Sequence, residues 1–306
     1  MIVSTKRILH KARRGCYAVG AFNINNMEIA QAVVEAAERE NAPILLQTSE
    51  GAIEYAGMGM LLGIGGMLAS RASVPAALHL DHGKKVDIVK EAIGAGYQSV
   101  MFDGSSLPYE KNVELTRSLV VLAHKAGVSV EAELGAIAGI EDFVSVEEQN
   151  AHLTDPWQAR EFVKQTQCDF LAIAIGTAHG AYKFKKKSQL DIKRLQAVAK
   201  LVSAPLVLHG ASSVPKKLVS KIERHGGFLG GASGVSDSDL KKAVASGISK
   251  VNTDTDIRLA FTLGVRQTLA KHPDYFDPRA ILKPAYEEMV EIVRWKIKLL
   301  GSHNKA

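Results

Sequence analysis

The feature of the sequence that most constrains its fold is a series of short apolar runs that alternate with helical segments. A short apolar run that stops at a turn is typical of a strand buried on both faces of a parallel sheet. Eight such strands joined by helices predict a (β/α)8 TIM barrel. The predicted strands are residues 17–22, 44–47, 76–80, 98–102, 128–133, 170–175, 205–208 and 248–251.

Helical segments fill the stretches between these runs, and further long helices follow the last strand. We expect one barrel domain that spans residues 1–306, with extra C-terminal helices. A doubly wound sheet is the alternative, but it needs a cleft where the strand order reverses. No Gly-x-Gly-x-x-Gly turn follows the first strand, and the chain has no Walker-type phosphate loop, so the barrel is favoured.

The charge balance bears on the partners of the chain. Its 306 residues carry a formal net charge of +6. The Lys and Arg residues are spread through the helical segments, which favours a solvated surface and a site for anionic substrates. A nucleic-acid partner would require a focused basic face with interleaved aromatic residues, and none is found.

Three features that the sequence lacks indicate the cellular compartment of the protein. The first residues, 1–14, lack the apolar core of a signal peptide. The most apolar stretch, residues 57–69, is interrupted by glycines and is too short to cross a bilayer. The two cysteines do not form a disulfide framework. We therefore expect a cytoplasmic protein with no membrane segment.

Polar side chains stand at the end of every predicted strand. In a TIM barrel the active site is built from the carboxyl ends of the strands, so these residues predict one catalytic face. They are Asn23, Gln47, Ser49, Asp81, His82, Asp103, Glu133, His179, His209, Ser212, Asn252 and Asp254.

Three of these residues, His82, His179 and His209, suggest a metal site. Three neutral imidazoles with an open fourth position are typical of catalytic zinc. The alternative is three unrelated capping or core histidines, which is less favoured for three strand ends of one barrel. Asp103 and Glu133 are expected to fix imidazole tautomers, or else to bond neighbouring loops.

Two other ionisable residues lie close to the histidines. Asp81 adjoins His82, and it either orients the histidines or exchanges a proton with a substrate hydroxyl. His79 lies inside the third strand, where we expect a structural role or none.

Small and hydroxyl-bearing residues follow the seventh and eighth strands, as Gly210-Ala211-Ser212-Ser213 and Asn252-Thr253-Asp254-Thr255. The loops at these positions of a TIM barrel often bind phosphate, because backbone N–H groups can approach the ligand. Two tight turns with helix caps are the alternative.

A long segment of weak periodicity, residues 135–155, follows the fifth strand and contains Glu141 and Asp142. Loops of this length are often lids, and a carboxylate on a lid suits general acid–base catalysis. An exposed surface loop is the alternative. Lys183 follows the sixth strand, where it suits either an anionic substrate or a Schiff base.

Five motifs make the chain resemble the class II, metal-dependent fructose-bisphosphate aldolases nearly from end to end. They are Leu80-Asp81-His82-Gly83, Val130-Glu131-Ala132-Glu133-Leu134-Gly135, Ala174-Ile175-Gly176-Thr177-Ala178-His179-Gly180, Leu208-His209-Gly210-Ala211-Ser212 and Asn252-Thr253-Asp254-Thr255-Asp256.

The resemblance implies a zinc-dependent cleavage of fructose 1,6-bisphosphate into two triose phosphates, through a metal-stabilised enediolate. It implies that His82, His179 and His209 bind the zinc, with Asp103 and Glu133 near the metal. Asp81 then exchanges a proton with the C4 hydroxyl. Glu141 acts at C3 of the bound triose.

For substrate binding, the resemblance implies that Arg258 binds the C6 phosphate and that Asn252 contacts the enediolate carbon. Asn23, Gln47, Ser49 and Asp254 are expected to contribute from the same face. The residues expected at the C1 phosphate, where Na⁺ or K⁺ often helps, are Gly180, Lys183, Gly210, Ser212 and Thr255.

Tagatose-1,6-bisphosphate aldolase is the alternative activity within the family. There, Ala typically replaces Asp254 and Lys replaces Arg258, so this chain favours fructose. The chain departs from the usual pattern at Ala136 and at residues 185–189. The resemblance also suggests a homodimer or homotetramer.

Three other classes compete with this interpretation. A Schiff-base aldolase would use Lys183 and ignore chelators. A barrel metallohydrolase commonly begins with a His-x-His pair on an early strand, and none is present. A non-catalytic sugar-phosphate sensor would be expected to lose Asp81 or a ligand histidine, and all are present.

Overall fold

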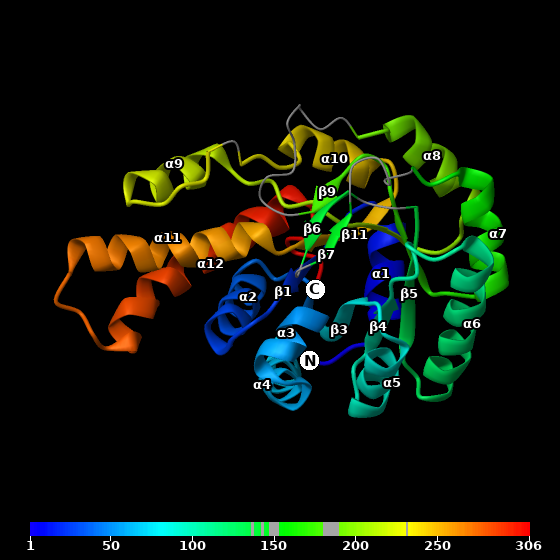
Figure 1. Ribbon diagram of the computed structural model, residues 1–306, viewed down its shortest axis with the longest axis horizontal. Coiled ribbons are helices and arrows are strands. Elements are labelled where there is room, and N and C mark those ends of the chain that lie inside the picture. The colour runs from blue at the N-terminus through cyan, green and yellow to red at the C-terminus, as the bar shows by residue number, and fades with distance from the viewer. Residues whose placement is uncertain (136–137, 142–143, 147–152, 180–189, 231) are drawn as a thin grey trace.

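Eight parallel strands close into a barrel in the order β1-β11-β10-β8-β5-β4-β3-β2, with helices around it (Figure 1). The computed structural model describes residues 1–135, 138–141, 144–146, 153–179, 190–230 and 232–306. The barrel confirms the predicted TIM fold, and each strand overlaps a predicted one. The strands are β1 (Val19–Asn23), β2 (Ile44–Ser49), β3 (Ala76–Gly83), β4 (Ser99–Phe102), β5 (Ser129–Leu134), β8 (Phe170–Ile173), β10 (Leu206–Leu208) and β11 (Ile248–Thr253).

Apolar side chains fill most of the barrel interior at its amino-terminal end. Helix α1 (Thr5–Arg14) closes this end, where Ile8 and Leu9 pack against inward side chains such as Val19, Ala77 and Val207. Its basic residues face outward, which gives it the amphipathic pattern of a surface helix. These apolar side chains surround the buried hydroxyls of Thr5 and Ser99, and the polar strand ends lie at the opposite end of the barrel.

The outer faces of the strands pack against helices that follow them in the chain. Along β5, for example, Val130 and Ala132 belong to the large core between sheet and helices, whereas Glu131 points into the barrel. The surrounding helices are α2 (Met27–Arg39), α3 (Glu50–Ala56), α4 (Met58–Arg71), α5 (Val86–Ala95), α6 (Tyr109–Lys125), α7 (Pro156–Thr166), α8 (Ile192–Leu201), α9 (Lys216–Arg224) and α10 (Asp237–Ala245).

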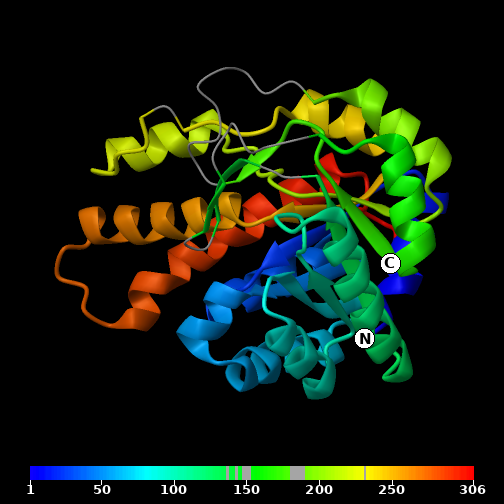
Figure 2. The same ribbon diagram turned by 45° about the vertical axis from the view of Figure 1, so that its right-hand side comes forward.

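Two long helices at the C-terminus, α11 (Thr255–Lys271) and α12 (Pro278–Leu299), form a hairpin that extends away from the barrel (Figure 1). They confirm the extra helices expected from the sequence. Helix α12 returns along α2, where Arg294 pairs with Glu40 at 2.7 Å. The two chain termini lie near each other (Figure 2).

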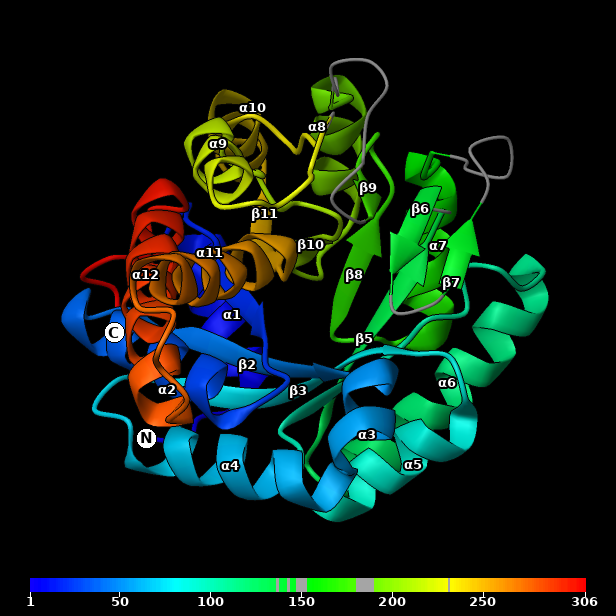
Figure 3. The same ribbon diagram turned by 60° about the vertical axis from the view of Figure 1, so that its left-hand side comes forward.

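The structure corrects the prediction of a long irregular segment after β5. Residues 138–141 and 144–146 form an antiparallel pair, β6 (Ala138–Glu141) and β7 (Val144–Val146). Strand β6 also pairs with β9 (Ala178–His179), and Figure 3 shows β6 and β7 beside the ends of β5 and β8. Strands this short carry too few residues for periodicity to reveal them.

Local signals in the sequence mark the starts of helices α7 and α10. Asp155 caps α7 with its side chain and Pro156 occupies its first turn, which is a strong helix start. The segment between β2 and β3 forms two helices, α3 and α4, which bend by 104° at Gly57, where φ is 83°. No single helix in the described part of the chain is long and apolar enough to cross a membrane, and only this bent pair passes a test of length and composition.

Candidate metal centre and active site

The end of β3 presents two consecutive side chains to the same site. Successive residues of a regular strand point to opposite faces, but the pairing of β3 with β4 shifts between Leu80 and Gly83. His82 lies in this shift with φ at 47°, a backbone conformation that is costly for a residue with a side chain. As a result, Asp81 and His82 both contact residues inside the barrel.

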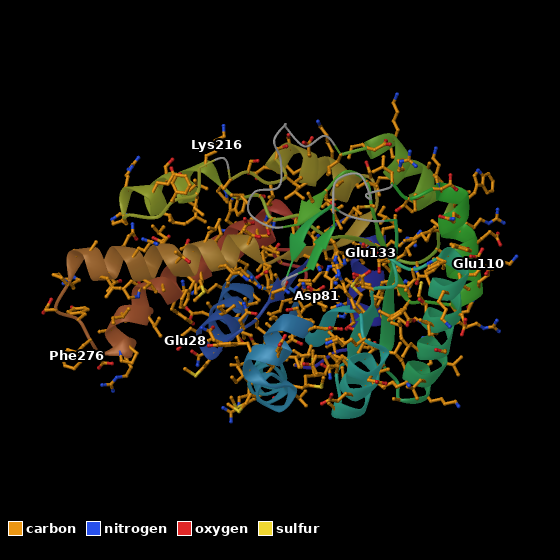
Figure 4. All side chains as sticks on the ribbon, in the orientation of Figure 1. Glu28, Asp81, Glu110, Glu133, Lys216 and Phe276 are labelled. Atoms are coloured by element: carbon orange, nitrogen blue, oxygen red, sulfur yellow. The ribbon has the colours of Figure 1, made fainter. Side chains whose placement is uncertain are left out.

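Asp81 is held by three side-chain amides from neighbouring strands. Its Oδ2 accepts hydrogen bonds from Asn23 Nδ2 at 2.9 Å and Gln47 Nε2 at 3.1 Å. Its Oδ1 accepts one from Asn252 Nδ2 at 2.8 Å. Asp81 is 1% exposed, and Figure 4 places it near the centre of the molecule. Four predicted site residues therefore meet in one buried network.

His82 is bonded to a second predicted carboxylate. Its Nδ1 lies 3.0 Å from Oδ2 of Asp103, whose other oxygen accepts from Ser105 Oγ at 2.6 Å. Burial raises the pKa of Asp103, but the hydrogen bonds from His82 and Ser105 outweigh burial and hold the pKa well below its usual range. Because an ionised carboxylate only accepts, neutral His82 carries its proton on Nδ1 and its lone pair on Nε2.

His209 shows the opposite tautomer. It is completely buried, and its Nε2 lies 2.7 Å from Oε1 of Glu131. Asn252 Nδ2 lies 3.2 Å from Nδ1 of His209 and also donates to Asp81. Burial and the nearby His82 ring lower the pKa of His209, although Glu131 acts against them. Neutral His209 thus carries its proton on Nε2 and its lone pair on Nδ1.

These two ring nitrogens face each other. Nδ1 of His209 and Nε2 of His82 are 2.7 Å apart, and the rings meet edge to face. Two imidazole nitrogens at this distance can share a proton or ligate a metal ion, and imidazoles with carboxylate partners behind them are typical metal ligands. The residues present therefore fit a metal ion.

Carboxylates complete two groups that can hold a metal, each with its ligand atoms within 4.8 Å of one another. The first is Asp81, His82 and His209, and the second is His82, Asp103 and Glu133. Glu133 is 2% exposed, so this carboxylate is buried beside His82 and Asp103. The structure thus brings these strand-end side chains together in two overlapping groups.

The third predicted histidine, His179, lies in β9, and its side chain is outside the described part of the structure. The backbone there runs against the loop after β10. A Cβ atom on Gly210, whose φ is 59°, would lie 2.6 Å from the carbonyl oxygen of Ala178. Only glycine permits this contact, so the chain beside His179 lies directly against the chain beside His209.

The loops after β10 and β11 also meet. Ser212 is 3% exposed, and its Oγ accepts a hydrogen bond from the backbone N of Asp254 at 3.4 Å. Helix α11 begins at Thr255, so its amino terminus lies at the catalytic end of the barrel, where helix N–H groups favour an anion. Arg258 Nε donates to Asp254 Oδ1 at 2.8 Å.

A buried ion pair supports the loop after β10. Asp256 accepts hydrogen bonds from the backbone N–H groups of Ser213, at 3.0 Å, and Val214, at 2.8 Å. Lys296 of α12 lies 2.9 Å from the same carboxylate, and both side chains are fully buried. The C-terminal helix is thereby tied to the loop.

One predicted site residue has a different role in the structure, and several others lie outside its described part. Ser49 is buried, but its Oγ accepts from Ala52 N at 3.2 Å and caps α3, which is a structural role. Glu141 lies in β6, with its side chain outside the described part. Gly180 and Lys183 lie outside the described residues, as do Asp142, Ala136 and residues 185–189.

Glu131 and Lys250 contact the site but are not among the predicted site residues. Lys250 Nζ donates to Oε2 of Glu131 at 2.8 Å and lies 3.3 Å from Nε2 of His79. All three side chains are fully buried. Each stands inside a run that is otherwise apolar or small, and that pattern is the signal by which the sequence could have revealed them.

The strand ends of this closed parallel barrel bring imidazoles and carboxylates into groups that can ligate a metal. This is the architecture of a metal-dependent barrel enzyme. Residues 3–305 match the family model "Fructose-bisphosphate aldolase class-II". The chain is 51% identical to the fructose-bisphosphate aldolase of Thermus caldophilus and 47% identical to that of Helicobacter pylori, over the full length of each. The structure of the YdjI aldolase from Escherichia coli K12 matches with a TM-score of 0.81 and 31% identity, and the match covers 100% of both chains.

The chain belongs to the class II fructose-bisphosphate aldolase family. It is an aldolase, a lyase that acts on a carbon–carbon bond. The family is metal-dependent, which agrees with the two metal-ligating groups at the strand ends.

Proposed function

We propose that the protein catalyses the reversible cleavage of fructose 1,6-bisphosphate into dihydroxyacetone phosphate and glyceraldehyde 3-phosphate, in glycolysis and gluconeogenesis, with zinc as its metal. The observation that carries the proposal is the pair of facing nitrogens of His82 and His209, each backed by a carboxylate. These two residues and His179 would hold the zinc. Bound zinc would act as a Lewis acid toward the ketose carbonyl.

Asp81 is the proposed base for the C4 hydroxyl of the hexose. Three amide donors fix its carboxylate, so it can take the hydroxyl proton without a change in position. When the C3–C4 bond breaks, its electron pair stays on C3 and the aldehyde forms at C4. Glu141, or its neighbour Asp142, then gives a proton to C3, in keeping with the position of β6 near the catalytic end.

Phosphate binding positions the scissile bond. The proposed C1-phosphate site uses the amino terminus of α11 and the loop after β10, where the residues are Gly180, Lys183, Gly210, Ser212 and Thr255. Na⁺ or K⁺ is a proposed second ion there. Asn252 would lie against the reacting carbons, since its amide already joins Asp81 to His209.

Fructose is preferred over its C4 epimer tagatose in this proposal. The supporting observation is the contact between Asp254 and Arg258, two residues that differ in the sister activity. This contact would direct Arg258 toward the C6 phosphate. Measurement of kcat/KM for fructose and tagatose 1,6-bisphosphates tests the preference, and a higher value for tagatose would reverse the assignment.

We also propose that the chain is one cytoplasmic domain that forms a homodimer or homotetramer and binds neither nucleic acid nor membranes. The hairpin of α11 and α12 supports the oligomer, because Phe276 near its tip is 92% exposed (Figure 4). Phe228, beyond α9, is 86% exposed. Light scattering on the purified protein tests this proposal, and a monomer at micromolar concentration would contradict it.

A further inference from the structure

A continuous line of buried polar groups runs from the metal-site histidine His209 down the interior of the barrel. The line joins side chains from four strands and α1, and each of its members is completely or almost completely buried. Its contacts are His209 Nε2 to Glu131 Oε1 at 2.7 Å, Glu131 Oε2 to Lys250 Nζ at 2.8 Å, Lys250 Nζ to His79 Nε2 at 3.3 Å, His79 Nδ1 to Ser99 Oγ at 2.8 Å, and Ser99 Oγ to Thr5 Oγ1 at 2.8 Å.

The direction of each hydrogen bond follows from the chemistry of Lys250. An ammonium group can only donate, so Nε2 of His79 must accept and its proton must stand on Nδ1, which donates to Ser99. Burial, and then the charge of Lys250, lower the pKa of His79 well below its ordinary value, which agrees with a neutral ring. Lys250 is thus the only cation of this line, and it pairs with Glu131.

The carboxylate of Glu131 is fixed at both oxygens. Lys250 holds Oε2, and this leaves Oε1 directed at the ring of His209. Because Oε1 accepts, the proton of His209 must stand on Nε2. The amide of Asn252 donates to Asp81 and approaches Nδ1 of His209 at 3.2 Å, which is compatible with this tautomer. The contact is longer than the 2.7 Å contact of Glu131, so Glu131 is the partner that fixes the tautomer.

We infer that Glu131, held by Lys250, is a positioning residue that locks the orientation and tautomer of His209 and so presents Nδ1 to a divalent cation. This inference rests on the zinc site of the proposed function. Partners of this kind behind a metal ligand typically change metal affinity by about 10- to 100-fold when they are altered.

Zinc affinity of the zinc-free protein, measured by competition with a chromophoric chelator, tests the inference directly. Glu131→Gln keeps the size of the side chain but allows its amide to accept or donate, so the tautomer is no longer fixed. We expect zinc to bind about 10- to 100-fold more weakly. Glu40→Gln is the matched control, since Glu40 is a buried glutamate paired with Arg294 and Lys298 away from the site. Its zinc affinity should stay within about twofold of that of the original protein.

A double variant, Glu131→Gln with Lys250→Met, removes both buried charges and guards against a single variant that fails to fold. It should fold and still bind zinc about 10-fold or more weakly. If either variant binds zinc as tightly as the original protein does, the inference is wrong.

The ¹⁵N chemical shifts of the imidazoles in the zinc-free protein report the tautomer itself. The His209 resonances, assigned by their loss in His209→Gln, should show a proton on Nε2 in the original protein and a mixture of tautomers in Glu131→Gln. An unchanged single tautomer in Glu131→Gln would overturn the inference, even with the proposed function intact. A failure of the original protein to bind zinc would instead overturn the proposed function.

Discussion

Replacement of Lys296 by methionine should destabilise the protein strongly, although the residue lies on the C-terminal helix outside the barrel. Its Nζ is 2.9 Å from Asp256 and 2.9 Å from Ser213 Oγ, and both members of the ion pair are fully buried. Removal of one partner from a buried ion pair leaves an uncompensated charge, which typically costs about 3–5 kcal/mol. Methionine has a similar shape, so little packing is lost.

Urea denaturation at a fixed zinc concentration measures this cost as a change in the free energy of unfolding. Lys221→Met is the matched control, because Lys221 pairs with Glu288 at 3.7 Å on the partly exposed surface and should contribute less than about 1 kcal/mol. The double variant Lys296→Met with Asp256→Asn removes both charges, so its loss should be smaller than the sum of the two single losses.

The same variant has a functional consequence. Asp256 holds the backbone of Ser213 and Val214, the loop proposed to bind the C1 phosphate. We therefore expect the KM for fructose 1,6-bisphosphate to rise in Lys296→Met. A loss of less than about 1 kcal/mol, or strict additivity in the double variant, would refute the reasoning that a buried pair supports this loop.

Three further predictions concern the site. Asp81→Asn should lower kcat by about 10²- to 10⁴-fold with zinc content unchanged, and a kcat within about threefold would remove Asp81 as the base. Gly210→Ala should lower the free energy of unfolding, measured with urea, by more than about 1 kcal/mol. The reason is that φ is 59° and the added Cβ would meet the Ala178 carbonyl. A stability equal to that of the original protein would contradict this. Zinc-free protein should lose stability as pH falls below 6.5, the ordinary pKa of histidine, because His79 and His209 have lowered pKa values and only the unfolded chain gains their protons. The loss is up to about 1.4 kcal/mol per pH unit for each group, and urea denaturation at pH 7.5 and 5.5 should show it, whereas equal stability at both values would not fit.

The strands and the catalytic face could be predicted because a parallel barrel leaves a strong pattern in the sequence. Each strand is apolar along its length and polar at its end, and both features are local. Asp81, His82, His209 and Asn252 therefore appear in the sequence in the positions that the barrel later brings together.

Contacts that depend on register across the barrel could not be predicted in the same way. His82 points inward because β3 and β4 shift in register, and the residues next to His82 in the sequence do not predict that shift. Glu131 on β5 reaches His209 at the end of β10, past the strand β8 that lies between them, and Lys250 joins it from β11. The sequence shows that these side chains are unusual for buried strands, but not that they meet.

The account depends most directly on metal-dependent cleavage of fructose 1,6-bisphosphate. The decisive measurement is the cleavage rate of the purified protein before EDTA, after EDTA, and after zinc is added back. We expect the rate to vanish with EDTA and to return with zinc. A rate that survives EDTA but is abolished by borohydride in the presence of substrate would contradict the account, because the chemistry would then belong to a Schiff base on a lysine such as Lys183.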